Sequence, residues 1–459
     1  MSRFHSTCRI GCLTVLSFMS QPWGIQAQQI LTLETAVQEA RTNNPDLKAV
    51  RQKTGVAVGE LKTASLLFPF NPQVEFERTS DRYYAKQGEG GYDLSISQEV
   101  EIAGQRWRRR RVARAEVERA QAEAQDFERR LTADVREAFY RLLFSQRRAE
   151  TMKAIAGLNE QLADAAQRRF KAGDIPELDY NLVLIERSRS GADLALSGAR
   201  LHGAMGEMNR LLGRPPDAVT VAAEAPFWTT AEVVSKDPAV PRAETAGEPV
   251  KVPDLETLKA TALRARPDIR ALEAGVRAAR GAVSVARAGL APNPAFSLTY
   301  RVERSIFAGE DILGNPAVTG GIAGIRDRDR LLTVRVSVPF PLFNRNQGQT
   351  YAARAAQRAA ETELESLQRA VAIEVTAAHR RFESARQARR LFEEVAPKLD
   401  ENAALVVRAY RAGETDLATL LVEQDRIFRA KLAYLDALLE HESALTALER
   451  AVGEPISKP

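Results

Sequence analysis

Strict alternation of apolar and polar residues is confined to four short segments of this chain. They are 73–79, 92–100, 296–303 and 332–338. The remaining sequence mixes apolar residues with closely spaced charges of both signs, which is typical of solvated helix faces. We therefore predict a mainly α-helical protein with a small β part.

The longest helices are predicted at 104–171 and 345–411, and each is followed by a sharp turn and a returning helix, at 176–212 or 416–451. A helix of about 67 residues spans about 100 Å at 1.5 Å per residue. Globular helices are only a few turns long. This length predicts a coiled-coil or tubular architecture.

The same plan occurs twice along the chain. The stretch "LETAVQEARTNNPDL" (33–47) returns as "LETLKATALRARPDI" (255–269), 222 residues later. The turn glycines Gly173 and Gly413 are 240 residues apart, so the second copy carries 18 additional residues within 294–337. Each copy is predicted as helix, strand, strand, long helix, turn and returning helix. The expected divisions are a first repeat 28–213, a Pro-rich linker 214–253, a second repeat 254–453 and a tail 454–459.

The N-terminal segment has the features of an export signal. Basic residues precede the apolar run 10–19, which is too short to span a bilayer, and Ala27 is a plausible cleavage position. We predict a signal peptide at 1–27. Both cysteines, Cys8 and Cys12, lie inside it, so the mature chain would have no thiol. A lipidated Cys12 is the alternative.

The charge balance argues against a nucleic-acid partner. Lys and Arg number 65 against 60 Asp and Glu, a formal net charge of +5. The run "RWRRRR" (106–111) is the one strongly basic stretch. We interpret it as a helix start whose arginines pair with acids further along, such as Glu116 and Glu118. Contact with an acidic lipid surface is the alternative reading of this run.

Motifs for catalysis or metal binding do not occur in the sequence. His202, His379 and His441 are widely separated, and there is no H-x₃-H or H-E-x-x-H pattern. There is also no G-x-S-x-G, Walker loop or dinucleotide fingerprint. We expect no enzyme activity, no cofactor and no metal site.

The alternating segments fit two settings. A half-buried strand in a soluble antiparallel sheet shows the same pattern. The export signal, lengths of about 8–11 residues and charges on the polar face favour membrane strands around a wet lumen. Four strands cannot close a barrel, and an open edge cannot lie in lipid. Membrane insertion would therefore require oligomerisation.

The signal peptide, the duplicated plan and the Pro-rich middle linker together resemble the outer-membrane efflux protein family, the TolC-like channels. The resemblance covers essentially the whole mature chain. It implies a homotrimer in which twelve strands, four per chain, form an outer-membrane β-barrel continued by a periplasmic α-helical barrel. The stretch "SQEVEIAGQRWRRRRVARAE" (97–116) is further similar to the strand-to-helix passage of the cobalt–zinc–cadmium efflux branch.

The resemblance implies a passive exit duct of a tripartite efflux system, with heavy-metal cations as candidate cargo. Its partners would be two further copies of the chain, outer-membrane lipid, a periplasmic adaptor (membrane fusion) protein and a proton-driven inner-membrane pump. A structural coiled-coil or scaffold protein of the periplasm or cell surface is the alternative. That reading explains the long helices but not the duplicated alternating strands. Metal, drug and protein cargo all stay open.

The resemblance also assigns roles to the two turns. Phe170 and Gly173 in the first, and Tyr410 and Gly413 in the second, would be hairpin tips that contact the adaptor. Glycine permits the reversal because it alone takes the left-handed conformation without cost.

A pore constriction is expected just beyond the tips, at Asp179 and Thr419. Asp179 stands where the family often places a constricting Asp, and an ordinary exposed helical acid is the alternative. Thr419 stands where a second acid is common, so one acidic ring is expected instead of two. The segments 80–91 and 303–330 would then be loops on the outside of the cell.

Overall fold

The computed structural model describes residues 30–81, 89–223, 252–307 and 325–456. The predicted signal peptide and most of the predicted linker lie outside these residues. Two short strands, β1 (Ile30–Leu31) and β4 (Val221–Ala222), pair in parallel and join the start of the described chain to the segment that follows the first repeat.

The remaining elements occur in the same order twice, which confirms the duplicated helix–strand–helix plan. The first set is α1 (Leu33–Asn43), α2 (Pro45–Ala64), β2 (Gln73–Ser80), β3 (Gly90–Glu99), α3 (Gln105–Lys171) and α4 (Glu177–Leu212). The second set is α6 (Leu255–Ala265), α7 (Pro267–Ala288), β5 (Ala295–Phe307), β6 (Ile325–Ser337), α8 (Gln347–Ala412) and α9 (Leu417–Val452). The predicted bounds of the long helices are correct to within two residues, while the repeat boundaries stay predictions.

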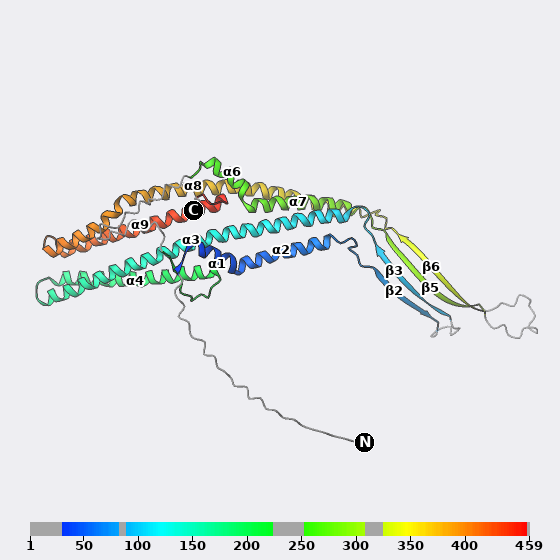
Figure 1. Ribbon diagram of the computed structural model, residues 1–459, viewed down its shortest axis with the longest axis horizontal. Helices are drawn as coiled ribbons and strands as arrows, with labels where there is room; N and C mark the ends of the chain where they lie inside the picture. Colours follow the sequence, from blue (N-terminus) through cyan, green and yellow to red (C-terminus); the bar gives the residue numbers. More distant parts are fainter. Residues whose placement is uncertain (1–29, 82–88, 224–251, 308–324, 457–459) are drawn as a thin grey trace, which may run out of the picture.

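Proline and its neighbours set the breaks between the short helices. Pro45 is the first residue of α2, and the Asn44 side chain accepts a hydrogen bond from the Leu47 amide at 2.9 Å. Proline is favoured there because its missing N–H would be unpaired in any case. Pro267 is likewise the first residue of α7, although the residue before it, Arg266, makes no side-chain cap. Within α8, Pro397 removes one helical hydrogen bond, and the orange part of this helix bends (Figure 1).

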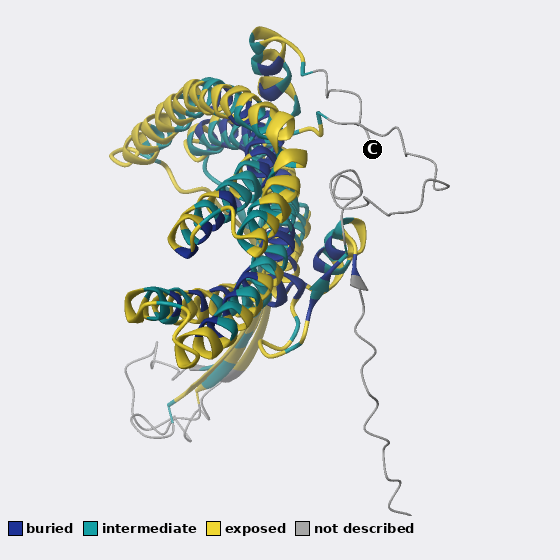
Figure 2. Ribbon diagram, turned by 90° about the vertical axis from the view of Figure 1, so that its left-hand side faces the viewer, coloured by how far each residue is buried: buried dark blue, intermediate teal, exposed yellow. Residues whose placement is uncertain are grey.

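The molecule is elongated, with the helices running side by side along its length and the sheet at one end (Figure 1). The hairpins α3–α4 and α8–α9 turn at the opposite end. Viewed along the long axis, the helices form an open arc instead of a closed bundle (Figure 2). In the described residues, no helix is both long and apolar enough to cross a membrane.

The sheet has four antiparallel strands in the order β2-β3-β5-β6. Strands β5 and β6 have 13 residues each, against 8 and 10 in β2 and β3. The predicted strands 296–303 and 332–338 were therefore too short, and the predicted loop 303–330 is partly strand. Some of the additional residues of the second copy lengthen the strands instead of the loop.

Three hydrophobic clusters hold the helices together. One lies where α1, α3, α4 and α9 meet and includes Leu142, Phe139 and Met208. A second joins α6 to α8 and α9 around Phe382 and Leu448. The third lies near the hairpin tips. Because many of the buried residues are alanines, the helices can approach one another closely.

The pairing predicted for the basic run 106–111 was wrong. Arg109 pairs with Glu101, which precedes the helix. Glu116 instead pairs with Arg119, one turn further along, and Glu118 pairs with Arg277 on α7. Residues three or four apart are neighbours on a helix, so the nearby Arg119, together with Arg277 of α7, takes the two acids.

Candidate functional site

The two hairpin tips are built from the same five-residue pattern, "FKAGD" (170–174) and "YRAGE" (410–414). Gly173 has φ 80° and Gly413 φ 78°, both in the left-handed region. A Cβ added to either glycine would meet no atom within 4 Å. The need for glycine is therefore set by the backbone conformation alone.

Paired hydrogen bonds close each tip. The Gly173 amide donates to the Phe170 carbonyl at 3.0 Å, and the next amide, Asp174, donates to the Arg169 carbonyl at 2.9 Å. The second tip repeats this pattern with distances of 3.1 and 2.9 Å. These are the two bonds of a Schellman motif, which ends a helix and reverses the chain.

Aromatic residues and a small apolar cluster support the tips. The Phe170 ring stacks on Tyr180 with centroids 5.1 Å apart and an interplanar angle of 4°. Tyr410 accepts a hydrogen bond from Arg169 of the other hairpin, at 3.0 Å. Beneath them, Ala163, Ala166, Val183, Leu417 and Leu420 are buried together. The structure thus brings together Phe170, Gly173, Tyr410 and Gly413 at one end of the molecule.

The two residues predicted for the constriction lie in the first turns of the returning helices. Asp179 is half-buried near the start of α4, where the helix dipole favours an acid. Thr419 is exposed, and its amide donates to Asp416 at 2.8 Å. Whether either residue narrows a pore stays a prediction.

Sequence reasoning missed Asp416, the helix cap of α9. Hydrogen bonds from the Thr419 side chain and amide lower the pKa of Asp416. An acid is common in the family at position 419, where this chain has a threonine. The second tip instead carries an exposed carboxylate three residues earlier, at Asp416. The sequence signal was the D-x-x-T spacing, typical of a helix N-terminus.

The two faces of the sheet differ. On β3 the apolar Tyr92, Leu94 and Ile96 are exposed, whereas the alternating polar residues Asp93 and Ser95 are half-buried. Asp93 is bound by the Arg301 guanidinium of β5 at 2.9 and 2.5 Å. On β3 the polar face is thus the more sheltered one, and the apolar face is left open.

Apolar side chains are also exposed on two long helices. On α4 they are Leu178, Ile185 and Leu196, and on α8 they are Ile373, Leu391, Val395 and Leu405. Isolated exposed apolar residues are ordinary. Here they recur along α4 and α8, the two helices at the edges of the open arc (Figure 2). Within the described part of the chain, no three His, Cys, Asp or Glu side chains gather closely enough to hold a metal ion.

The chain has an elongated, duplicated helical body that ends in a small sheet with an open apolar face. This architecture is typical of proteins that span the bacterial cell envelope. The chain belongs to the outer membrane efflux protein family, whose model matches residues 36–201 and 258–454. This confirms the resemblance found in the sequence. The protein accordingly lies in the outer membrane and extends into the periplasm.

Two relatives and one solved structure are similar along nearly the whole chain. The cobalt-zinc-cadmium resistance protein CzcC of Cupriavidus metallidurans is 26% identical over 430 residues, 92% of this chain and 90% of CzcC. The pyoverdine export outer membrane protein OpmQ of Pseudomonas putida is 25% identical over 450 residues, 92% and 85% of the two chains. The outer-membrane channel OprN has a TM-score of 0.67 at 20% identity and covers 92% of this chain and 90% of its own.

Proposed function

We propose that three copies of this chain build a passive outer-membrane exit duct of a tripartite efflux system. The observation that carries the proposal is the pair of open edges of the sheet. Strands β2 and β6 each pair on one side only among the described residues. An unpaired edge cannot lie in lipid, so a chain of this family must pair β2 of one copy with β6 of the next.

The faces of the sheet support the same assembly. In a membrane barrel, apolar residues face lipid and polar residues face the lumen. The exposed residues Tyr92, Leu94 and Ile96 suit the lipid side, and the Asp93–Arg301 pair suits a wet lumen. Twelve strands, four from each copy, then close the barrel.

The helical arc closes by the same symmetry. The exposed apolar residues of α4, such as Ile185, and of α8, such as Ile373, lie on the outer sides of these helices, where the described residues of one chain leave them uncovered. We infer that α4 of one copy packs against α8 of the next. The tips would then form a ring that contacts a periplasmic adaptor, with energy supplied by an inner-membrane pump.

Heavy-metal cations are the cargo that we favour, because CzcC is a relative along almost the whole chain. The similarity to OpmQ, an exporter of pyoverdine, makes a larger organic cargo the second candidate. Deletion of the gene should lower tolerance to cobalt, zinc and cadmium. Metal tolerance unchanged by deletion, with loss of export of an organic compound, would overturn the metal assignment while leaving the duct in place.

Neighbouring residues on β3 offer a matched test of the barrel. Leu94→Arg places a charge on the lipid side, at a cost of about 2–4 kcal/mol per copy near the bilayer midplane. Ser95→Arg places the same charge on the lumen side of the same strand. We expect heat-modifiable trimers and single-channel currents to be lost in the first variant and kept in the second. Equal behaviour of the two variants would contradict the proposed barrel.

A further inference from the structure

The open apolar face of the sheet changes character toward its loop end. The strand register aligns two apolar rows: Val74, Ile96, Leu298 and Val334, then Phe76, Leu94, Tyr300 and Leu332. The next two rows are Arg78, Tyr92, Val302 and Arg330, then Ser80, Gly90, Arg304 and Arg328. Four arginines, one on β2 and three on β5 and β6, therefore stand along the upper edge of the apolar band.

The charges of these arginines are not balanced by an ion pair within the described part of the chain. Arg304 and Arg328 lie directly opposite each other on β5 and β6, and like charges in that position are destabilising. All four arginines are exposed, and among the described residues none of them has an ion-pair partner. On the opposite face, by contrast, Arg301 is neutralised by Asp93. A bound anion from outside the chain would neutralise these four arginines.

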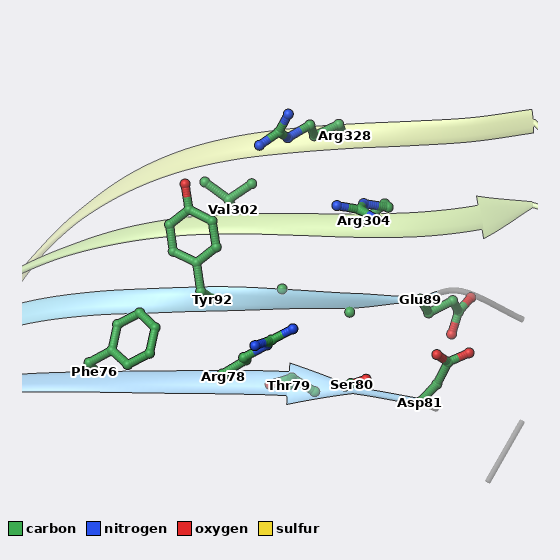
Figure 3. Close-up of a pocket in the computed structure, with 12 residues that line it drawn as sticks. Phe76, Arg78, Thr79, Ser80, Asp81, Glu89, Tyr92, Val302, Arg304 and Arg328 are labelled. Carbon is green, nitrogen blue, oxygen red and sulfur yellow. The ribbon is translucent and has the colours of Figure 1, made fainter. Parts of the chain in front are cut away.

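A hollow of about 750 Å³ lies over this region, with the arginines and the apolar floor on the same side of the sheet (Figure 3). Its floor includes Phe76, Tyr92 and Val302, with the two rings 6.5 Å apart. Arg78, Arg304 and Arg328 line its upper part. Two carboxylates, Asp81 and Glu89, lie at the loop end of the hollow, beyond the arginines (Figure 3).

We propose that this surface binds a phosphorylated glycolipid of the outer leaflet, of the lipid A class. Guanidinium groups bind phosphate through paired, charge-assisted hydrogen bonds. The aromatic and aliphatic floor below them would receive acyl chains. Arginines in two rows on three strands suit a head group with more than one phosphate, which a simple phospholipid does not have.

The position of the arginines along the strands indicates that the bound lipid lies in the outer leaflet. They lie at the end of the strands farthest from the helices (Figure 1), and the helices extend into the periplasm. The apolar residues below them on β5, Phe296, Leu298 and Tyr300, span about 14 Å at 3.4 Å per residue and lie on the helix side of the arginines, within the apolar band of about 25 Å in membrane barrels. This inference rests on the proposed insertion of the sheet as a barrel.

A matched pair of variants on β6 tests the inference. Arg328→Gln removes a cation from the lipid side, and Arg335→Gln removes one from the lumen side of the same strand. Purified, delipidated trimers would be titrated with bisphosphorylated lipid A, and bound lipid measured by native mass spectrometry. We expect Arg328→Gln to raise the dissociation constant for lipid A by about tenfold, as for loss of a hydrogen bond to a charged group. The double variant Arg304→Gln with Arg328→Gln should raise this constant further. Arg335→Gln should bind as wild type.

Three outcomes would overturn the inference. Wild-type affinity in the Arg304→Gln and Arg328→Gln double variant would show that these arginines do not bind the lipid. Equal loss in Arg335→Gln would indicate a diffuse charge effect. Phosphatidylglycerol binding as tightly as lipid A would make the surface a general anionic contact. Failure of the proposed duct is distinguishable, because wild-type preparations would then lack trimers and single-channel currents.

Discussion

The Arg169 guanidinium of the first hairpin donates a hydrogen bond to the Tyr410 hydroxyl of the second hairpin, at 3.0 Å. The two residues are 241 positions apart in the sequence. Arg169 also supplies the carbonyl that closes its own tip. This contact therefore couples the turn of one hairpin to the position of the other.

Removal of the Tyr410 hydroxyl should loosen the two tips. Tyr410→Phe keeps the ring but deletes the hydrogen bond, a loss of about 1 kcal/mol. We expect more frequent opening or larger conductance in planar bilayers, with trimers intact. Tyr180→Phe is the matched control, because no hydrogen bond of the Tyr180 hydroxyl occurs among the described residues and its ring still stacks on Phe170. Wild-type currents from Tyr410→Phe would show that this bond does not hold the tips together.

The tip glycines should be sensitive to backbone conformation and not to size. Gly173→Ala forces alanine into the left-handed region, at a cost of about 1–2 kcal/mol, although its Cβ would meet no neighbour within 4 Å. Gly157→Ala, in the middle of α3 with equally open space, should instead stabilise the helix by about 1 kcal/mol. Thermal unfolding of both variants measures the difference, and equal shifts would contradict the conformational argument.

Proline at the tips should affect export more than assembly. Gly173→Pro or Gly413→Pro cannot adopt the positive φ of the native turn. We expect efflux to be lost while trimers still reach the outer membrane, since the tips lie at the far end from the sheet (Figure 1). Normal resistance in cells that carry either variant would exclude an essential contact at the tips.

Asp179 is predicted to set the ion preference of the duct. Three symmetry copies would place three carboxylates near the axis, and Thr419 supplies no second ring. Asp179→Asn should therefore reduce cation selectivity, read from the reversal potential under a salt gradient, with little change in stability. Asp164→Asn, an exposed acid on α3, is the control and should leave selectivity unchanged. Identical reversal potentials for Asp179→Asn and wild type would make Asp179 an ordinary surface acid.

A buried ion-pair group predicts a loss of stability in acid. Arg266, which is 5% exposed, donates to Asp268 at 2.7 Å and to Glu374 at 2.8 Å. Burial alone would raise the pKa of Asp268, but the Arg266 hydrogen bond and charge outweigh it and hold this pKa below its usual value. The stabilisation is thus complete above the unfolded pKa of about 3.9 and is lost as the pH falls through the lower folded value.

The Asp268→Asn variant tests this assignment. It should be less stable than wild type near neutral pH, because the buried Arg266 loses an ionised partner. Its stability should fall less between about pH 5 and pH 2, because one linked proton is removed. Parallel stability curves for the variant and wild type over that range would show that Asp268 does not contribute to acid unfolding.

The loop between β2 and β3 should be reachable from outside the cell. A cysteine at Gly90 is a poor probe, since its Cβ would lie 2.8 Å from the Thr79 carbonyl oxygen. The exposed Glu89 is the better position. Glu89→Cys should react with an impermeant maleimide in intact cells, whereas Lys171→Cys at the first tip should react only after the outer membrane is opened. The reverse pattern would invert the proposed topology.

The sequence alone predicted the long helices and the turns well, because each has a strong local signal. Pro45 and Pro267 are the first residues of α2 and α7, and Gly173 and Gly413 mark reversals that other residues resist. The ends of β5 and β6 were missed. Residues such as Arg328 and Arg330 continue the alternation with charge in place of apolar side chains, so the hydrophobic pattern stops before the strand does.

Contacts between distant segments were beyond sequence reasoning. Tyr410 was expected to matter at the tip, but its donor, Arg169, depends on how the two hairpins pack. Glu101, in the link between β3 and α3, pairs with Arg109 eight residues later, a spacing that helix geometry does not predict. Spacing along a helix predicts neighbours three or four residues away and is silent about neighbours two hundred residues away.

The unbroken course of α3, from the edge of the sheet to the first tip, has a mechanical consequence. At 67 residues it is a rod of about 100 Å, and its membrane end would be the pivot of any tilt. A tilt of only about 5° at the pivot displaces the far end of such a rod by about 9 Å. A small shift of α3 beside the bilayer would thus be magnified toward the tips. The tips could then separate by several ångströms with little change in how the helices pack near the membrane.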